Sequence, residues 1–335
     1  MESVVLKSMI ALTAMAALFG AVLAIASRIF AVYRDPRVGQ ILECLPNANC
    51  GGCGYPGCQA YAEAAVAAGE APAACPPGGA EVARKVAEIL GASAGEHVPK
   101  VAVVHCKGGR STAVQRLDYE GIHDCRAAIL VGGNPKACVF GCLGLGTCKA
   151  VCPFGAVELD DEGVVHIDPG KCTGCGKCVE ACPVNIIELV PVDMKVHVRC
   201  SSHDKGKKAK SVCDVACIGC QMCVKKCPSE AIHMEEDLAV IDYSKCTNCG
   251  ICAAVCPTNA IIDDVEKRPV ALIGSKCEGV GECAKVCPVK AISGEEGERH
   301  EVDRKKCIGC GLCLDACPTR AITMVGALGL QKERG

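Results

Sequence analysis

Cysteine dominates the chemistry of this sequence, with 32 cysteines among 335 residues. Four segments, which begin at Cys172, Cys217, Cys246 and Cys307, match the pattern C-x2-C-x2-C-x3-C-P without deviation. In such a segment three thiolates curl one loop around three irons of a cubane, and the fourth thiolate reaches a neighbouring cluster. The spacing therefore predicts [4Fe-4S] clusters that are built in pairs. Zinc also binds C-x2-C, but four such segments in paired register favour iron.

Two further units keep the C-x3-C-P ending, so the chain holds six units, which we group as pairs 1, 2 and 3. Because the fourth cysteine of each unit serves its partner, the pairing predicts the ligand sets. Pair 1 gives Cys138, Cys142, Cys148 with Cys182, and Cys172, Cys175, Cys178 with Cys152. Pair 2 gives Cys217, Cys220, Cys223 with Cys256, and Cys246, Cys249, Cys252 with Cys227. Pair 3 gives Cys307, Cys310, Cys313 with Cys287, and a set of only three, Cys277, Cys283 and Cys317.

The set of three lacks a ligand because Val280 occupies the place of its second cysteine. A valine side chain has no atom that binds iron. The sequence leaves three outcomes open for this seventh site: a three-iron cluster, a four-iron cluster with one labile iron, or no cluster.

A different motif precedes the pairs, with Cys50, Cys53, Cys58 and Cys75 in the spacing C-x2-C-x4-C-x16-C. Glycines surround its first three cysteines and let the backbone approach a sulfur closely and aim N–H groups at it. The segments 59–69 and 80–90 are predicted to be helices. We expect a further complete [4Fe-4S] site here, which makes six in all, with a structural zinc ion as the alternative.

An uncharged run of 19 residues extends from Ser8 to Ala26. As a helix it spans about 28 Å, enough to cross a bilayer core of about 30 Å. Arg28, Arg34 and Arg37 follow it, so the bulk of the chain is expected on the cytoplasmic side of the cell (inner) membrane. A cleaved signal peptide is the alternative, but export would carry the cysteines into an oxidising space. In the cytosol thiols stay reduced, which argues against a disulfide scaffold.

The composition limits what else the chain does. Only five Tyr and four Phe are present, with no Trp, so side-chain packing alone is not expected to organise the fold. A net charge of -2 excludes nucleic-acid binding through a basic surface. We expect an α+β chain with a transmembrane anchor (1–28), a small [4Fe-4S] domain (29–95), a connecting segment (96–132), pair 1 (133–192), a basic linker (193–212), pair 2 (213–266), pair 3 (267–327) and a tail (328–335).

The paired units resemble bacterial 2[4Fe-4S] ferredoxins over residues 133–326. The segment Leu45-Pro-Asn-Ala-Asn-Cys-Gly-Gly-Cys-Gly-Tyr-Pro-Gly-Cys58, with Asp35-Pro-Arg-Val before it and Cys75-Pro-Pro-Gly-Gly after it, resembles the cluster domain of the B subunit of the Rnf complex. The match covers residues 1 to about 190, and the remainder is similar to the long, multi-ferredoxin form of that subunit. This resemblance implies a membrane complex that moves electrons between ferredoxin and NAD while it translocates Na+ or H+.

The same resemblance implies that this chain is the electron-transfer subunit of a translocase-type oxidoreductase. It would carry no complete active site and no catalytic residue, receive electrons from soluble ferredoxin, and pass them to other membrane and flavin-bearing subunits. The alternatives are a polyferredoxin subunit of a hydrogenase or heterodisulfide-reductase-type complex, and a self-sufficient oxidoreductase, for which the sequence offers no flavin motif.

Five cysteines fall outside the sets: Cys44, Cys106, Cys125, Cys200 and Cys213. Cys106 follows a predicted strand over 101–105, and we expect it to be a buried side chain. A further metal or redox site formed by Cys106 with Cys125 is the alternative. The lysines at 205, 207, 208 and 210 are expected in a solvated linker, with electrostatic docking of an acidic ferredoxin as the alternative.

Overall fold

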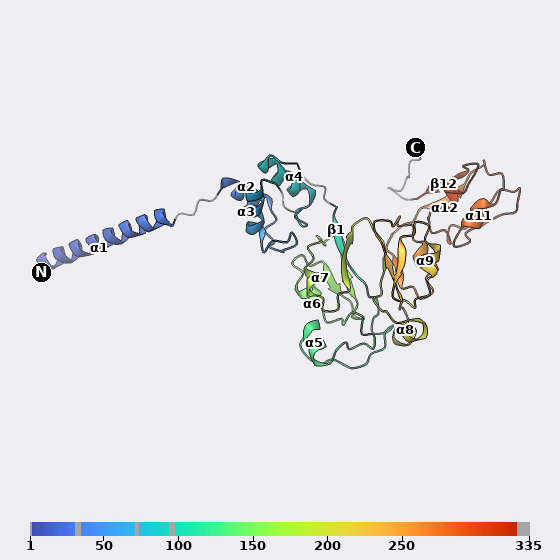
Figure 1. Ribbon diagram of the computed structural model, residues 1–335, viewed down its shortest axis with the longest axis horizontal. Helices are drawn as coiled ribbons and strands as arrows, with labels where there is room; N and C mark the ends of the chain where they lie inside the picture. Colours follow the sequence, from blue (N-terminus) through green and yellow to red (C-terminus); the bar gives the residue numbers. More distant parts are fainter. Residues whose placement is uncertain (1, 31–34, 71–73, 94–97, 327–335) are drawn as a thin grey trace.

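The computed structural model describes residues 2–30, 35–70, 74–93 and 98–326, as a series of modules that follow one another along the chain (Figure 1). The first is helix α1 (Glu2–Ile29), which lies apart from the other elements (Figure 1). Its segment Met9–Ile29 has a mean hydropathy of 2.4, and none of it is buried. An uncovered apolar helix of this length has the properties of a membrane span, as the sequence predicts.

The second module is a small helical domain. Its helices are α2 (Pro36–Cys44), α3 (Cys58–Ala68) and α4 (Gly79–Leu90), so the two helices predicted from the sequence are confirmed. Asp35 caps α2 by accepting a hydrogen bond of 2.9 Å from the Arg37 amide. Ile41, Tyr61 and Val86 form the centre of its core, and Cys75 is buried against them. The core therefore fixes one of the four cysteines of this domain.

Three ferredoxin-like modules follow, and each contains a pair of two-stranded antiparallel sheets. One sheet is a hairpin between the two units: β2 (Val157–Leu159) with β3 (Val165–Ile167), β6 (Ile232–Glu235) with β7 (Leu238–Ile241), and β10 (Ile292–Ser293) with β11 (Glu301–Val302). The other joins the first and last strands of the module: β1 (Lys100–Val104) with β4 (Ile187–Pro191), β5 (Val196–Val198) with β8 (Ile261–Asp263), and β9 (Val270–Ile273) with β12 (Ile322–Val325). The two sheets hold the units of a pair together.

A short helix follows each cysteine loop. These helices are α6 (Thr147–Ala150), α7 (Lys177–Ala181), α9 (Met222–Lys226), α10 (Ile251–Val255), α11 (Glu282–Val286) and α12 (Leu312–Asp315). The residue before each one is left-handed, and it is glycine in every case except Gln221, whose φ is 60°. Glycine adopts this conformation without the strain that a Cβ adds. The turn brings the third cysteine of each unit into the helix.

Pairs 1 and 2 each carry an insertion between the first strand and the first cysteine loop. Residues 105–137 form the first and include α5 (Cys125–Val131), and residues 199–216 form the second and include α8 (Gly206–Val212). From the sequence, these residues are expected largely in a connecting segment (96–132) and a basic linker (193–212). In pair 3 only residues 274–276 separate β9 from Cys277.

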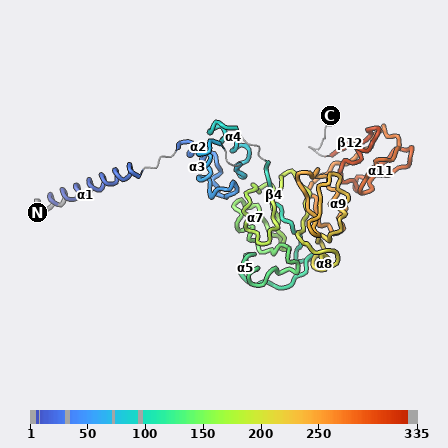
Figure 2. Tube along the Cα trace, viewed as in Figure 1, coloured from blue at the N-terminus to red at the C-terminus, as the bar shows by residue number. Residues whose placement is uncertain are grey.

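The two insertions lie against each other. The Val114 amide donates to the Val212 carbonyl at 3.0 Å, and the Asp214 amide donates to the Thr112 carbonyl at 2.9 Å. Ala113 and Cys213 form an isolated antiparallel bridge. Helices α5 and α8 accordingly lie on the same side of the molecule (Figure 2). The insertions thus join pair 1 to pair 2.

Candidate iron–sulfur cluster sites

The cysteines of the helical domain surround one cavity. Cys50, Cys53, Cys58 and Cys75 all line it, together with Leu45 and Tyr61. Burial raises the pKa of the Cys75 thiol, and the other three cysteines add to the rise because their charges lie close by. The Cys58 amide donates to Asn49 Oδ1 at 2.9 Å, which fixes the loop in front of α3. The four thiols therefore converge on one site.

Three more cavities in the ferredoxin-like modules are each lined by four cysteines. One has Cys152, Cys172, Cys175 and Cys178; a second has Cys217, Cys220, Cys223 and Cys256; a third has Cys287, Cys307, Cys310 and Cys313. In each, three cysteines come from one loop and the fourth comes from the other unit of the pair. The sequence predicts the same four residues in each case.

The cysteines of the second set of pair 2 also lie close to one another. Burial raises the pKa of the Cys246 thiol, and the charges of Cys249 and Cys227 add to the rise. In pair 3, Cys283 has Cys277 and Cys317 as its charged neighbours, and its pKa is raised mainly by burial. The side chain of Val280 is 43% exposed. The place of the missing cysteine in that loop thus opens to solvent.

In pair 1, Cys138 lies beside Cys106, a cysteine that the sequence prediction leaves outside the ligand sets. A methyl group on Gly141 would lie 3.5 Å from Cys138 Sγ and 3.6 Å from Cys106 Sγ, so these two sulfurs border the same glycine. Burial raises the pKa of Cys148 to about 11, and its first charged neighbours are Cys125 and Cys182. The structure thus brings together two pairs of cysteines, 106 with 138 and 125 with 148, that sequence reasoning kept apart.

A signal for this arrangement is present in the sequence. Counting back from Cys152, the second cysteine of an intact unit would stand at Leu145, and the first at Cys142. Cys138 therefore precedes the motif. Leu145 packs against Cys125 in a small core under α5.

Backbone amides point at several of the sulfurs. The amides of Ala231, Ala291 and Ala321 donate to the sulfurs of Cys227, Cys287 and Cys317 at 3.3, 3.2 and 3.3 Å. In each case the donor lies four residues after the cysteine, so the fold repeats the contact. Hydrogen bonds to the sulfurs are among the features that set the potential of an iron–sulfur cluster.

Neighbouring modules meet at their cysteine loops. A methyl group on Gly52 would lie only 2.7 Å from the Cys175 carbonyl oxygen, so the helical domain contacts the second loop of pair 1. Cys50 is one of the charged neighbours that add to the burial-raised pKa of Cys175. In the same way Cys249 of pair 2 adds to the burial-raised pKa of Cys310 of pair 3.

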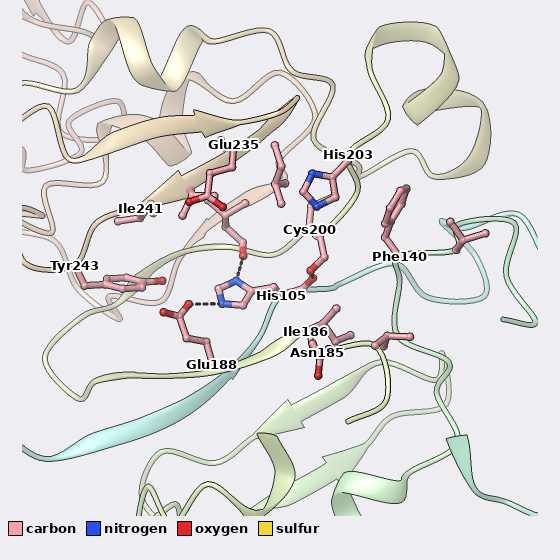
Figure 3. A pocket seen from close by; sticks show the side chains of 17 residues that line it. His105, Phe140, Asn185, Ile186, Glu188, Cys200, His203, Glu235, Ile241 and Tyr243 are labelled. Carbon is pink, nitrogen blue, oxygen red and sulfur yellow. Dashed lines mark hydrogen bonds and ion pairs between the residues drawn. The ribbon is translucent and has the colours of Figure 1, made fainter. Parts of the chain in front are cut away.

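A larger pocket of 490 Å³ lies between pairs 1 and 2 (Figure 3). His105 lies within it, with Nε2 2.9 Å from Glu188 Oε2 and Nδ1 2.6 Å from the Val198 carbonyl oxygen (Figure 3). Tyr243 and Cys200 contribute to its lining. The pocket thus borders the insertions where the two pairs join.

Zinc and iron make different demands on these cysteines. A zinc ion binds four ligands at about 2.0–2.3 Å from a single centre. Across the described residues, no three side chains of His, Cys, Asp or Glu are grouped so as to hold one metal ion. The spacing of the ferredoxin-type loops, in which the fourth cysteine comes from the other unit, is the observation that favours iron.

Family comparisons agree with this chemistry. The family "4Fe-4S dicluster domain" matches residues 216–260 and 271–324, "4Fe-4S binding domain" matches 165–188, and "Putative Fe-S cluster" matches 45–77. The chain is therefore an iron–sulfur protein of the tandem ferredoxin type.

Comparison with individual relatives identifies the family of iron–sulfur proteins to which the chain belongs. The B subunit of the Na(+)-translocating ferredoxin:NAD(+) oxidoreductase complex of Acetobacterium woodii is 49% identical over 74% of this chain and 75% of its own length. The proton-translocating counterpart of Clostridium ljungdahlii is 49% identical over 72% of this chain and 86% of its own. The B subunit of the ion-translocating oxidoreductase complex of Methanosarcina acetivorans is 43% identical over 74% of this chain and 94% of its own length. The chain belongs to this family, the B subunits of Rnf complexes.

One solved structure is also similar in sequence. It is the formate dehydrogenase - heterodisulfide reductase - formylmethanofuran dehydrogenase complex from Methanospirillum hungatei, which matches at 25% identity over 53% of this chain and 73% of that chain. Its TM-score is 0.25, which is too low to support an argument about fold.

The contact at Gly52 gives a first prediction. Gly52→Ala would place a methyl group against the backbone of Cys175, and overpacking of this kind typically costs about 1–3 kcal/mol. We expect faster amide exchange in the loops around residues 50–58 and 172–178. Gly39→Ala is the matched control, because no heavy atom lies within 4 Å of its added methyl group. Equal exchange in the two variants would contradict the contact.

Proposed function

We propose that the chain is an electron relay that carries electrons from one module to the next within an ion-translocating ferredoxin:NAD oxidoreductase complex. The observation that carries the proposal is the succession of cysteine sites, with neighbouring modules in contact loop to loop at Gly52–Cys175. Membership in the family of Rnf B subunits supports it. Iron–sulfur clusters span about −700 to +450 mV, a range that includes the potentials of reduced ferredoxins.

In this function the protein supplies position and environment, and the clusters supply the redox chemistry. The cysteines hold the iron, the amides aimed at sulfur tune the potential, and the small apolar cores keep water from the sites. No proton transfer is required on this chain, so we assign no catalytic residue. We assign the flavin and nicotinamide sites to other subunits of the complex, and soluble ferredoxin to the role of electron donor.

The proposed ligand sets follow the cavities and the sequence spacing. Five sets of four are Cys50, Cys53, Cys58, Cys75; Cys152, Cys172, Cys175, Cys178; Cys217, Cys220, Cys223, Cys256; Cys227, Cys246, Cys249, Cys252; and Cys287, Cys307, Cys310, Cys313. Each is proposed to bind one [4Fe-4S] cluster. We assign Cys142, Cys148 and Cys182 as three of the ligands of the first site of pair 1.

The relay is tested by removing one of its members. Cys175→Ala deletes a ligand of the site that faces the helical domain, and we expect membranes with this variant to lose ferredoxin-dependent NAD reduction. Cys44→Ala, a cysteine outside every set, is the matched control. If the electron paramagnetic resonance signal of one cluster disappears while NAD reduction continues at the rate of the unmodified chain, the relay is wrong.

The side of the membrane is a separate proposal. Arg28 ends α1 and further arginines follow it in the sequence, and such an excess marks the cytoplasmic side. We propose that all cluster modules face the cytoplasm. A reporter that works only in the cytoplasm should be active when it is fused after residue 335. If a reporter that works only after export is active at the same position, the assignment is reversed.

Val280 decides the state of the seventh site. Val280→Cys restores the fourth thiolate beside Cys277, Cys283 and Cys317. If the native site holds iron, the substitution should convert a three-iron signal to a four-iron signal, or stabilise a labile iron. Spectra and iron content are the measurements. If both forms give the same spectra and iron content, and neither shows the signal of a cluster bound by Cys277, Cys283 and Cys317, the site is empty.

A further inference from the structure

Four cysteines in the two insertions or directly after them occupy equivalent positions in pairs 1 and 2. Cys106 and Cys200 each lie two residues after the first strand of their pair, β1 and β5. Cys138 and Cys213 each lie four residues before the first cysteine of the following loop, Cys142 and Cys217. Two cysteines per pair, at matching places, are the pattern expected of a site shared between two similar halves.

The fold brings these four cysteines to one place. A methyl group on Gly108 would lie 3.1 Å from Cys213 Sγ and 4.0 Å from Cys106 Sγ, and Gly141 is similarly flanked by the sulfurs of Cys138 and Cys106. Cys106 therefore lies between Cys138 and Cys213. Ser201 Oγ donates to the His105 carbonyl at 2.7 Å, so Cys200 and Cys106, which adjoin these two residues, lie on neighbouring segments. Cys200 and Cys213 are buried in one core. All four thiols are free.

The backbone at this place resembles the backbone at the other sites. The amides of Cys217 and Ser202 both donate to Cys200 Sγ, at 3.3 and 3.4 Å. The sulfurs approach Gly108 and Gly141 closely, so that a methyl group on Gly108 would crowd Cys213 Sγ. Amides aimed at sulfur and glycine beside it are the features seen at the ferredoxin-type loops.

Buried positive charge surrounds the same cysteines. Lys136 is only 4% exposed, and its Nζ donates to the Gly108 carbonyl at 2.6 Å. Among the residues that the structure describes, it takes part in no ion pair. The Nε atom of Arg199 is buried without a hydrogen-bond partner, and its Nη2 lies 3.5 Å from the Cys106 carbonyl oxygen. Arg199 has Asp264 as a neighbour of opposite charge. Burying the Lys136 cation is costly unless a negative charge compensates it, and an anionic cluster with thiolate ligands provides one.

We propose that Cys106, Cys138, Cys200 and Cys213 bind an additional [4Fe-4S] cluster at the junction of pairs 1 and 2. We call this the junction site. Cys125 then replaces Cys138 as the fourth ligand of the cluster held by Cys142, Cys148 and Cys182. Cys125 lies at the start of α5, its amide donates to Thr147 Oγ1 at 2.7 Å, and it packs beside Leu145 at the place of the missing cysteine.

This assignment accounts for nearly every cysteine in the chain. Seven sets of four and the set of three at Val280 use all of them except Cys44. It also places a site at the boundary between pairs 1 and 2, where the sequence predicted none. Cys106 shares a core with Cys142 of pair 1, and the Cys217 amide of pair 2 donates to Cys200 Sγ. The role as a link rests on the proposed relay function, whereas the presence of iron does not.

The first test counts iron in the full-length chain, purified anaerobically in detergent from cells that assemble its clusters. The double variant Cys200→Ser/Cys213→Ser should lose about four iron atoms per chain, the content of one cubane. Cys44→Ser is the control and should lose none. Unchanged iron content in the double variant overturns the junction site, whatever the electron-transfer activity is.

The second test assigns the ligands of the two neighbouring sites. Cys138→Ser should alter the same electron paramagnetic resonance signal as Cys213→Ser, and Cys125→Ser should alter the same signal as Cys182→Ser. If Cys138→Ser and Cys182→Ser alter one signal in common and Cys125→Ser alters none, then Cys138 is a ligand of the pair 1 cluster and the proposal is wrong.

A third measurement needs no substitution and remains decisive if a variant fails to fold. Iron anomalous scattering, or density from electron cryomicroscopy of the unmodified complex, should show iron between the four sulfurs of the junction site. Absence of density there, with clusters visible at the ferredoxin-type sites, excludes it. If iron is present but Cys200→Ser/Cys213→Ser leaves NAD reduction unchanged, the metal site stands and its role in the relay fails.

Discussion

The bond between a cysteine thiolate and iron is the interaction on which the rest of this structure depends. Aromatic residues make up only 3% of the chain, and the cores of the modules are small groups of Ala, Val and Ile into which cysteines are packed. In pair 1, for example, Val157 and Val165 share a core with Cys148 and Cys178. Because metal binding to such sites is coupled to folding, the clusters are structural elements as well as cofactors.

The fold solves a positional problem that recurs at each cluster. Three thiolates from one loop leave one iron of a cubane without a ligand. The two sheets of a module bring the other unit close enough to supply it. A residue with positive φ, such as Gly176, connects each cysteine loop to the short helix that follows. Backbone amides such as that of Ala291 donate hydrogen bonds to the sulfurs. These features need few residues, and pair 3 holds both of its cysteine sets between β9 and β12.

The insertions show how a repeated module acquires a new site without a new fold. Pair 3 passes directly from β9 to its first loop, whereas pairs 1 and 2 have extra chain at that position. The extra segments pair with each other through Val114 and Val212. The result is an interface with buried cysteines and the buried cation of Lys136. The proposed junction site takes two ligands from each pair.

The sequence by itself determined the membrane helix, the helical domain, and the intact cysteine loops, because these depend on local spacing: hydropathy over one helix, and two or three residues between thiolates. Strand β1 and helices α3 and α4 were likewise predictable from local pattern. Only the tertiary structure decided the neighbours of Cys106, Cys125, Cys138, Cys200 and Cys213. These residues are distant from one another in sequence. Their proximity arises from the contact between the two insertions and from the packing of α5 on a loop, which local spacing does not encode.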